Sequence, residues 1–374
     1  MKFIRHLMDV TAIMQLPKSQ RRIIFYSESN AYWVHLEGVL KEFLNLTDVP
    51  VCYVSSNKDD LGLQYKHPNL KSFNIDEGGC RDWFFKNIDA DVMVMTMPDL
   101  EQYQVKRSKY PVHYVYVQHS LVSLHMVYRR KAFDNFDTIF CAGPHHINEV
   151  RITEKAYGLP PKNLVEHGYG RLDSILEASK GRKAQSKNNP KKILVAPSWG
   201  KHALIESVGD KVVSNLLKNG FHVTLRPHPQ TVKFSKNTLD SICRKHTTNI
   251  NFEYEVDIAS QESLYQSDLM ISDWSGAALD HAFGLGKPVL FIDVPRKVNN
   301  QEYKSINIQP FEVWIRDKIG KTLCVEDLDS LSKLATSLLS VKQNIDYKSL
   351  VESNVFNAGV SSPVGAKYLT QLLN

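Results

Sequence analysis

The sequence predicts an α/β protein made of two doubly wound domains, each built on a mainly parallel sheet. Short apolar runs alternate with helical patterns along the chain, as in sheets covered by helices on both faces. The alternation breaks once, at a polar and basic stretch over residues 180–192, and then restarts. With 374 residues, the chain is long enough for about two domains. We expect one domain over residues 1–185 and a second over residues 186–374, whose last helices could cross back to the first.

The first half contains six apolar runs that we interpret as strands of one sheet. They cover residues 22–26, 49–55, 70–75, 92–97, 112–118 and 138–142. Between the first two runs, apolar residues recur at helical spacing and predict a helix over residues 31–46. In the second half, the runs at residues 193–196, 222–226, 250–254, 269–272 and 289–292 predict a second sheet. Two such domains are expected to face a central cleft lined by the carboxyl ends of their strands.

The segment from Asp268 to Asp280 carries the most specific functional signal. It reads as an apolar strand, a tight polar turn and a helix that begins at Ser275 and Gly276. A helix N-terminus presents unpaired backbone N–H groups and the positive end of the helix dipole. The sequence therefore predicts a phosphate or diphosphate site at this corner. A plain helix cap by Ser275 is the simpler alternative. We favour Asp273 and Asp280 as structural hydrogen-bond acceptors over metal ligands.

A second motif, Arg226-Pro-His228-Pro, ends another predicted strand of the second domain. The two prolines restrict the backbone on both sides of His228, so its imidazole is held with little freedom. Such a group suits the stabilisation of charge that develops during a reaction. The alternative is a histidine that only caps the strand end. Arg226 can pair with a phosphate or with a carboxylate at the sheet edge, and the sequence leaves both open.

In the first half, His119 stands at the carboxyl end of the predicted strand over residues 112–118. A neutral histidine there can take a proton from an acceptor hydroxyl, and its alternative is a residue that merely terminates the strand. The histidines have no recognised metal-ligand spacing. We therefore expect no metal and no cofactor.

The amino-acid composition is typical of a globular protein and limits the kinds of partner that we expect. Hydrophobic residues make up 43% and charged residues 23%, as in globular proteins in water, and the net charge is only +6. This excess is too small for a dedicated nucleic-acid binder, and it fits an anionic substrate or an anionic membrane surface. Five widely spaced cysteines read as free thiols of a reducing compartment. No run is long enough to span a bilayer, so we expect a cytoplasmic protein.

The first sixteen residues have apolar positions at helical spacing, followed by Lys18, Arg21 and Arg22. We favour a helix packed on its domain. The alternative is an amphipathic helix that lies on the inner face of the membrane and makes the protein peripheral.

Four segments, in this order, resemble the CDP-glycerol glycerophosphotransferase family, whose enzymes prime and polymerise teichoic acids. The segment from His167 to Asp173 is similar to the family turn Gly-x-Pro-Arg-x-Asp, with Gly170 in place of proline. The segment from Ile193 to Trp199 resembles its Ala-Pro-Thr-Trp-Arg strand, with Ser198 for threonine and Gly200 where arginine is usual.

The other two segments complete the resemblance, which covers residues 165–295. Arg226-Pro-His-Pro resembles the family's Arg-x-His-Pro. The run from Ser272 to Asp280, with Gly286-Lys-Pro after it, resembles Ser-Asp-Tyr-Ser-Ser, with Trp274 for tyrosine and Gly276 for the second serine. The family also has a first-domain histidine followed by Gly-Thr; His119 is the candidate here, followed by Ser-Leu.

The resemblance implies a GT-B fold and a CDP-alcohol donor bound to the second domain. His119 and His228 would then be catalytic, with His228 stabilising the diphosphate or the leaving group. The donor-binding residues would be Pro197, Ser198, Arg226, Ser272, Asp273, Ser275 and Gly276. The expected activity transfers glycerol phosphate or ribitol phosphate to a hydroxyl of a polymer or lipid-linked acceptor in cell-surface polymer synthesis. Two alternatives stay open: a GT-B glycosyltransferase with a nucleotide-sugar donor, and a non-catalytic nucleotide- or polymer-binding subunit.

Overall fold

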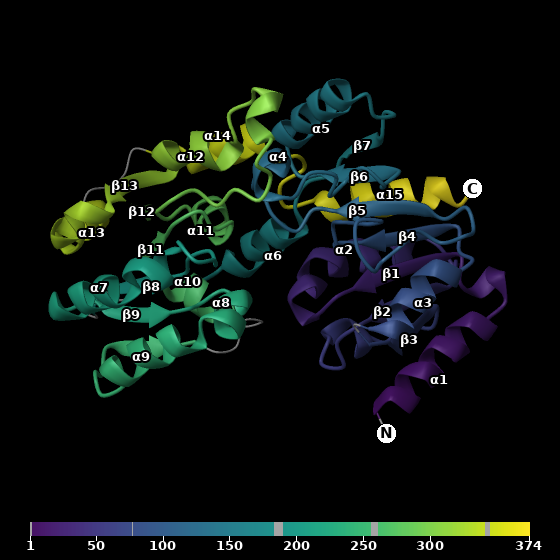
Figure 1. The fold of residues 1–374 in the computed structure, drawn as a ribbon, viewed down its shortest axis with the longest axis horizontal. Coiled ribbons are helices and arrows are strands. Elements are labelled where there is room, and N and C mark those ends of the chain that lie inside the picture. Colours follow the sequence, from purple (N-terminus) through teal and green to yellow (C-terminus); the bar gives the residue numbers. More distant parts are fainter. Residues whose placement is uncertain (1, 77, 183–189, 256–260, 341–344) are drawn as a thin grey trace. The chain divides into compact units, whose positions relative to one another are not determined.

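The computed structural model describes residues 2–76, 78–182, 190–255, 261–340 and 345–374, and its chain divides into two compact units (Figure 1). Unit 1 comprises Met1–Ser174, Asn299–Ile308 and Asn354–Asn374, and unit 2 comprises Ile175–Val298 and Gln309–Ser353. The chain thus passes from unit 1 to unit 2 after Ser174, within helix α6 (Gly170–Ser179). Most of the polar stretch that we interpreted as a linker, residues 183–189, lies outside the described residues.

Unit 1 is built on a seven-stranded sheet in which every strand pair is parallel. The strand order is β3-β2-β1-β4-β5-β6-β7. The strands are β1 (Ile23–Ser27), β2 (Val51–Ser55), β3 (Leu70–Asn74), β4 (Val92–Met95), β5 (His113–Val117), β6 (Thr138–Cys141) and β7 (Asn163–Glu166). The central strands are buried along their whole length, which explains why they read as continuous apolar runs and not as alternating patterns.

Helices cover both faces of this sheet, and one apolar cluster fills the space on each side. The helices are α1 (Lys2–Gln15), α2 (Asn30–Leu46), α3 (Gly79–Asn87), α4 (Leu124–Val127), α5 (Pro144–Tyr157) and α15 (Ser361–Leu372), with short 3-10 turns at Lys18–Gln20, Leu61–Leu63 and Tyr303–Ile306. Helix α15 packs along α2 in the cluster that contains Phe43, Ala366 and Leu369. The last helix of the chain therefore belongs to unit 1.

The N-terminal helix α1 packs on unit 1. Val10 and Ile13 are 2% and 0% exposed within the core beside β3 and α3, and Asp9 accepts a hydrogen bond from the Asn74 backbone N–H at 3.0 Å. Leu7 and Met8 remain exposed on the other side of the helix. Among the described residues, no helix is long and apolar enough to cross a membrane.

Unit 2 has a six-stranded parallel sheet in the order β10-β9-β8-β11-β12-β13. Its strands are β8 (Lys192–Val195), β9 (His222–Leu225), β10 (Phe252–Tyr254), β11 (Leu269–Ser272), β12 (Val289–Asp293) and β13 (Gly320–Cys324). Its helices are α7 (Leu204–Lys218), α8 (Pro229–Phe234), α9 (Lys236–His246), α10 (Glu262–Gln266), α11 (Ala277–Leu285), α12 (Phe311–Ile319), α13 (Leu331–Ser340) and α14 (Tyr347–Asn354), with a 3-10 segment at Val325–Ser330.

The direction of winding reverses between β8 and β11 of unit 2. The strands from β8 to β10 run to one side of the sheet and those from β11 to β13 run to the other. In open parallel sheets, ligands bind outside the carboxyl ends of the strands at such a switch point. The carboxyl ends of β8 and β11 lead into the Pro197–Trp199 and Asp273–Ser275 segments.

Two edge strands, β7 and β13, were missed by the sequence analysis. The residues of β7 are all exposed or half-buried, and in β13 only Gly320 and Leu323 are buried. An edge strand has one neighbour and a partly solvated face, so its apolar signal is weak.

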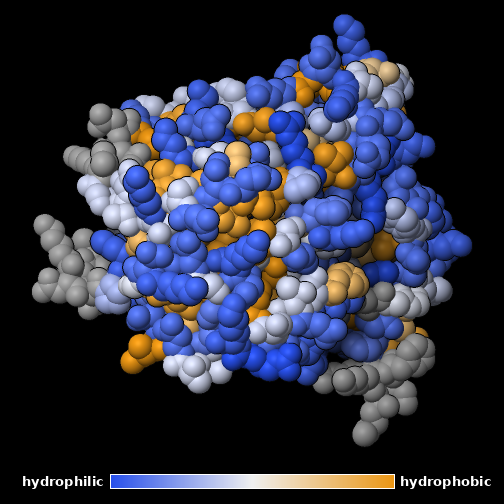
Figure 2. Space-filling view, turned by 60° about the vertical axis from the view of Figure 1, so that its left-hand side comes forward, coloured by the Kyte–Doolittle hydropathy of each residue, from blue (hydrophilic) through white to orange (hydrophobic). Residues whose placement is uncertain are grey.

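Hydrophilic side chains cover most of the face seen in Figure 2, with apolar areas between them.

Candidate functional site

The switch point of unit 2 is held together by Asp273, whose side chain is buried. Its Oδ1 accepts a hydrogen bond from the Ser198 N–H at 2.6 Å, and its Oδ2 accepts one from the Leu204 N–H at 3.0 Å. The carboxylate therefore joins the end of β8 to the first turn of α7. Ser272 is fully buried and donates its hydroxyl hydrogen to the Ala196 carbonyl oxygen at 2.8 Å. Both side chains shape the backbone of the corner, as expected for structural acceptors and donors.

His228 is the third residue after β9, at the strand end where the sequence analysis placed it. Its backbone is extended and it caps α8: its Nδ1 accepts a hydrogen bond from the Gln230 N–H at 3.1 Å. A neutral imidazole that accepts at Nδ1 carries its hydrogen at Nε2. Pro229 occupies the first helical position and lacks an N–H, so the prolines define both the capping geometry and the tautomer. The ring is half-buried, and Nε2 is the nitrogen that carries the hydrogen.

His228 is part of an aromatic stack that sequence reasoning did not find. The Trp199 ring lies 6.0 Å from the His228 ring and 6.3 Å from the Phe234 ring, measured between centroids. The ammonium of Lys297 stands 4.4 Å from the centroid of Trp199. Trp199 therefore serves as a common platform for an imidazole and a lysine cation that are far apart in sequence.

The helix N-terminus predicted near Ser275 is present. Helix α11 begins at Ala277, with Gly276 as its N-cap, and the Ser275 Oγ accepts a hydrogen bond from the Ala277 N–H at 3.3 Å. Among the described residues, the backbone N–H groups of Ser275 and Gly276 donate no hydrogen bond. These two donors, together with the helix dipole, form a local anion-binding geometry.

Arg226 follows β9, and its Nε lies 3.7 Å from Glu255 Oε2. Both side chains are about nine-tenths buried. Of the two alternatives left open by the sequence, the structure shows the carboxylate partner. Pro197 and Ser198 are also buried, so their contribution to the corner is mainly the course of the backbone.

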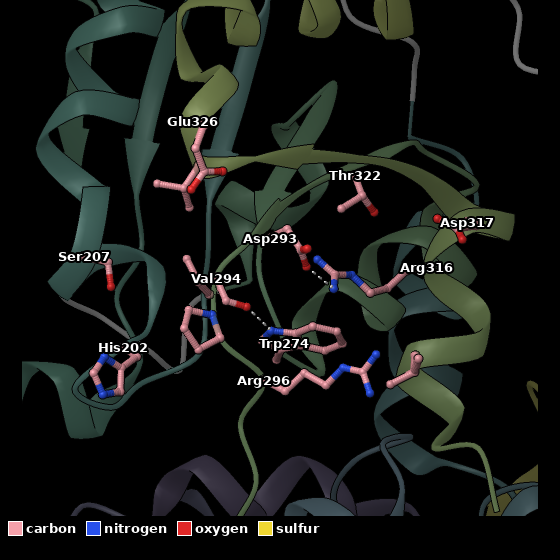
Figure 3. Close-up of a pocket in the computed structure, with 13 residues that line it drawn as sticks. His202, Ser207, Trp274, Asp293, Val294, Arg296, Arg316, Asp317, Thr322 and Glu326 are labelled. Atoms are coloured by element: carbon pink, nitrogen blue, oxygen red, sulfur yellow. Dashed lines mark hydrogen bonds and ion pairs between the residues drawn. The ribbon is translucent and has the colours of Figure 1, made fainter.

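A cavity of about 740 Å³ opens beside this corner, at the carboxyl ends of β12 and β13 (Figure 3). The Trp274 indole N–H donates to the Val294 carbonyl oxygen at 2.9 Å, and the Arg316 guanidinium lies 3.8 Å from the centroid of that ring. Figure 3 shows Arg316 directed toward Asp293, with 3.2 Å between Arg316 NH1 and Asp293 Oδ1. The cavity is thus lined by charges of both signs. None of the predicted donor-binding residues lines it; Trp274, from the same turn, does.

In unit 1, His119 lies just beyond β5 in a network of hydroxyl groups. Its Nδ1 donates to the Thr96 carbonyl oxygen at 3.0 Å and is also 3.0 Å from the Tyr116 hydroxyl. Its Nε2 accepts a hydrogen bond from the Tyr128 hydroxyl at 3.1 Å, because the carbonyl contact assigns the ring hydrogen to Nδ1. Burial lowers the pKa of His119 to about 4, so the ring is neutral at pH 7 with Nε2 as its basic nitrogen.

Other rings enclose His119 that the sequence did not point to. Tyr32 and His35, from α2, lie 5.4 and 6.1 Å from its ring, and His35 stacks on Tyr169 at 5.6 Å. The Tyr169 hydroxyl donates to the His119 carbonyl oxygen at 3.2 Å. Tyr169 belongs to the segment that resembles the Gly-x-Pro-Arg-x-Asp turn, so that segment packs against His119.

Comparison with known proteins assigns the family. Residues 16–305 match the family described as CDP-Glycerol:Poly(glycerophosphate) glycerophosphotransferase. The chain belongs to this family. It is therefore an enzyme of a glycerophosphotransferase family, as the resemblance of the four motifs predicted. No curated protein sequence matches the chain.

Solved structures confirm a GT-B-like fold. The wall teichoic acid polymerase TagF, in a structure soaked with CDPG, shares 14% identity over 100% of this chain and 97% of its own, with a TM-score of 0.61. The UDP-GlcNAc 2-epimerase of Methanocaldococcus jannaschii shares 14% identity, covers 93% of this chain and 99% of its own, and has a TM-score of 0.58. The epimerase of Neisseria meningitidis, at 12% identity, 94% and 99% coverage and a TM-score of 0.59, is similar. At these identities the likeness concerns the fold.

Proposed function

We propose that this enzyme transfers a glycerol-phosphate or ribitol-phosphate unit from a CDP-alcohol to an acceptor hydroxyl of a cell-surface polymer or its lipid-linked precursor. The family assignment supports the reaction class. The observation that carries the site assignment is that the carboxyl edge of the sheet of unit 2 bears both His228, whose Nδ1 caps α8, and the start of helix α11. A fixed N–H donor and backbone N–H groups match the oxygens of a diphosphate.

In this mechanism, the acceptor oxygen attacks the phosphorus that carries the alcohol, and the bond from that phosphorus to the oxygen of CMP breaks. The proton of the acceptor hydroxyl passes to His119 Nε2, which requires the acceptor to displace the Tyr128 hydroxyl from that nitrogen. CMP leaves with the charge of its phosphate neutralised by His228 and the N–H groups of Ser275 and Gly276. Ser272, Asp273, Pro197 and Ser198 position the corner, and Arg226, which pairs with Glu255, belongs to the same donor site.

Each preorganised donor of this kind contributes a few kcal/mol to the transition state. His228→Ala should therefore lower turnover at least about a hundredfold while the protein stays folded. The assay is CMP release from CDP-glycerol and from CDP-ribitol, with thermal unfolding as the control for folding. His222→Ala is the matched control, because His222 lies at the opposite end of the same strand.

Near-normal turnover by a folded His228→Ala protein would reject the assigned role. Release of a nucleoside diphosphate from a nucleotide sugar, without CMP release from either CDP-alcohol, would instead favour a glycosyltransferase. Binding of CDP-alcohols without any product would favour a binding subunit.

A further inference from the structure

Lys297 lies in the segment after β12 and is absent from every motif that the sequence analysis singled out. Its ammonium stands over the Trp199 ring at 4.4 Å, and the centroid of the same ring lies 6.0 Å from that of the His228 ring. We propose that Lys297 binds the diphosphate of the donor, as a cation that the Trp199 platform holds beside His228. This inference rests on the proposed function of the same corner. It adds a lysine cation to the residues proposed to bind the donor there.

The positive charge of Lys297 is not neutralised by a direct partner. Among the described residues, its ammonium makes no hydrogen bond and no ion pair. Two carboxylates act on it electrostatically, those of Asp273 and Glu206. Asp273 is engaged by two backbone N–H groups, and Glu206 Oε1 accepts from the Ser235 hydroxyl at 2.8 Å. A half-buried cation without a salt bridge is costly unless a ligand supplies the counter-charge.

The chemistry of this group matches a phosphate ligand and not a purely structural contact. Lysine binds phosphate as a point charge at the end of a flexible stem, so it can follow a diphosphate that changes shape as it is cleaved. A cation over a half-buried aromatic ring gains only a modest attraction from that contact, which gives little reason to bury the amine. His228 and the N-terminus of α11 follow strands β9 and β11 of the same parallel sheet, and both favour the same ligand.

The position of Lys297 also predicts a pH limit on donor binding. Burial lowers the pKa of its ammonium to about 8, and the charges of Asp273 and Glu206 offset part of that shift. In the free enzyme the cation is therefore lost as the pH rises through about 8. The phosphate oxygens of CDP are already ionised at pH 7.5, so a decline in affinity above that pH reports the protein.

The test is calorimetric titration of CDP between pH 7.5 and 9.5, with inorganic pyrophosphate at pH 7.5 as a probe without a nucleoside. Lys297→Met keeps the stem and removes the charge, and we expect a loss of affinity of about tenfold to a hundredfold for both ligands. Lys297→Arg keeps a charge that does not titrate in this range, so its affinity for CDP should stay level to pH 9.5 while that of the wild type falls. Lys233→Met is the matched control: Lys233 lies over the neighbouring Phe234 ring at 5.3 Å, and its loss should leave binding unchanged.

Thermal unfolding of each variant separates binding from folding. Unchanged CDP and pyrophosphate affinity in a folded Lys297→Met protein would overturn the role of Lys297 and leave the proposed transferase intact. Loss of pyrophosphate binding in Lys297→Met, combined with a wild type that does not bind CDP, would support the diphosphate site and reject a cytidine donor. A wild type that binds neither ligand would overturn both.

Discussion

The buried carboxylate of Asp273 should be the main structural support of the donor corner, and its removal should destabilise unit 2. In Asp273→Ala, the N–H groups of Ser198 and Leu204 lose their acceptor. An unsatisfied buried N–H costs about 1–3 kcal/mol, with values toward the upper end for a bond to a charged group. Leu204 is also the first residue of α7, so the anion at this helix N-terminus is lost as well, worth about 0.3–1 kcal/mol. The expected loss is about 3–5 kcal/mol.

A loss of this size corresponds to a fall in melting temperature of about 6–20 °C, since 1 kcal/mol shifts a domain of this size by about 2–4 °C. Urea unfolding followed by circular dichroism measures the free energy directly. Asp273→Asn keeps one carbonyl acceptor but turns an amide toward the other N–H group, so it should fall between the wild type and Asp273→Ala. The affinity for CDP should also drop, because the backbone around Ser198 and residue 273 loses the hydrogen bonds that fix its conformation.

Asp210→Ala is the matched control for this prediction. Asp210 lies on the same helix, α7, but its carboxylate is half exposed and pairs with Lys245 at 2.6 Å on the surface. Such pairs contribute at most about 1 kcal/mol. If Asp273→Ala unfolded within about 1 kcal/mol of Asp210→Ala, the reasoning from the two buried hydrogen bonds would be refuted.

Two further predictions concern the scaffold. Burial lowers the pKa of His281 to about 3 and that of His167 to about 4, so both side chains stay neutral in the folded protein at pH 5. In the unfolded chain the same histidines take up protons below about pH 6.5, so the free energy of unfolding should fall by roughly 2 kcal/mol for each histidine between pH 7 and pH 5. Urea midpoints that coincide at the two pH values would contradict this. Gly168→Ala should destabilise unit 1 by about 3 kcal/mol or more, because φ of Gly168 is +107° and a Cβ there would lie 2.3 Å from the Phe356 carbonyl oxygen. A urea midpoint equal to that of the wild type would show that the turn can relax.

The fold could be predicted from the sequence because its signals are local. Buried parallel strands appear as apolar runs, and the helices between them carry periodic apolar positions. The strands missed, β7 and β13, are edge strands whose side chains are largely solvated. The last helices were expected to be able to cross back to the first domain, whereas the return of residues 299–308 to unit 1 depends on contacts with distant elements and leaves no local pattern.

The candidate site was predictable where the backbone itself carries the signal. Prolines on both sides of His228 and a small-residue helix start at Ser275 leave a mark in the sequence. The Trp199 stack and the Tyr128 contact with His119 leave none, because each pairs side chains that are distant in the sequence or follow no known spacing. One signal was available for Lys297: it follows the apolar run that became β12, at the edge where the carboxyl ends of parallel strands gather.

Several residues of the motifs that identify the family therefore hold the fold together, in addition to any part that the motifs have in the reaction. Asp173 accepts hydrogen bonds from the backbone N–H groups of Gly359 and Ser361, at 2.7 and 2.8 Å, and so ties the C-terminal segment to unit 1. Asp273 does the same for β8 and α7 in unit 2. A buried carboxylate with two N–H donors allows little substitution, since either loss leaves polar groups unpaired. Gly200, where the family's arginine is usual, has φ +132°, a conformation that favours glycine. Arginine at this position would thus strain the backbone next to Trp199. The difference from the family at Gly200 therefore involves the backbone conformation as well as the charge of the side chain.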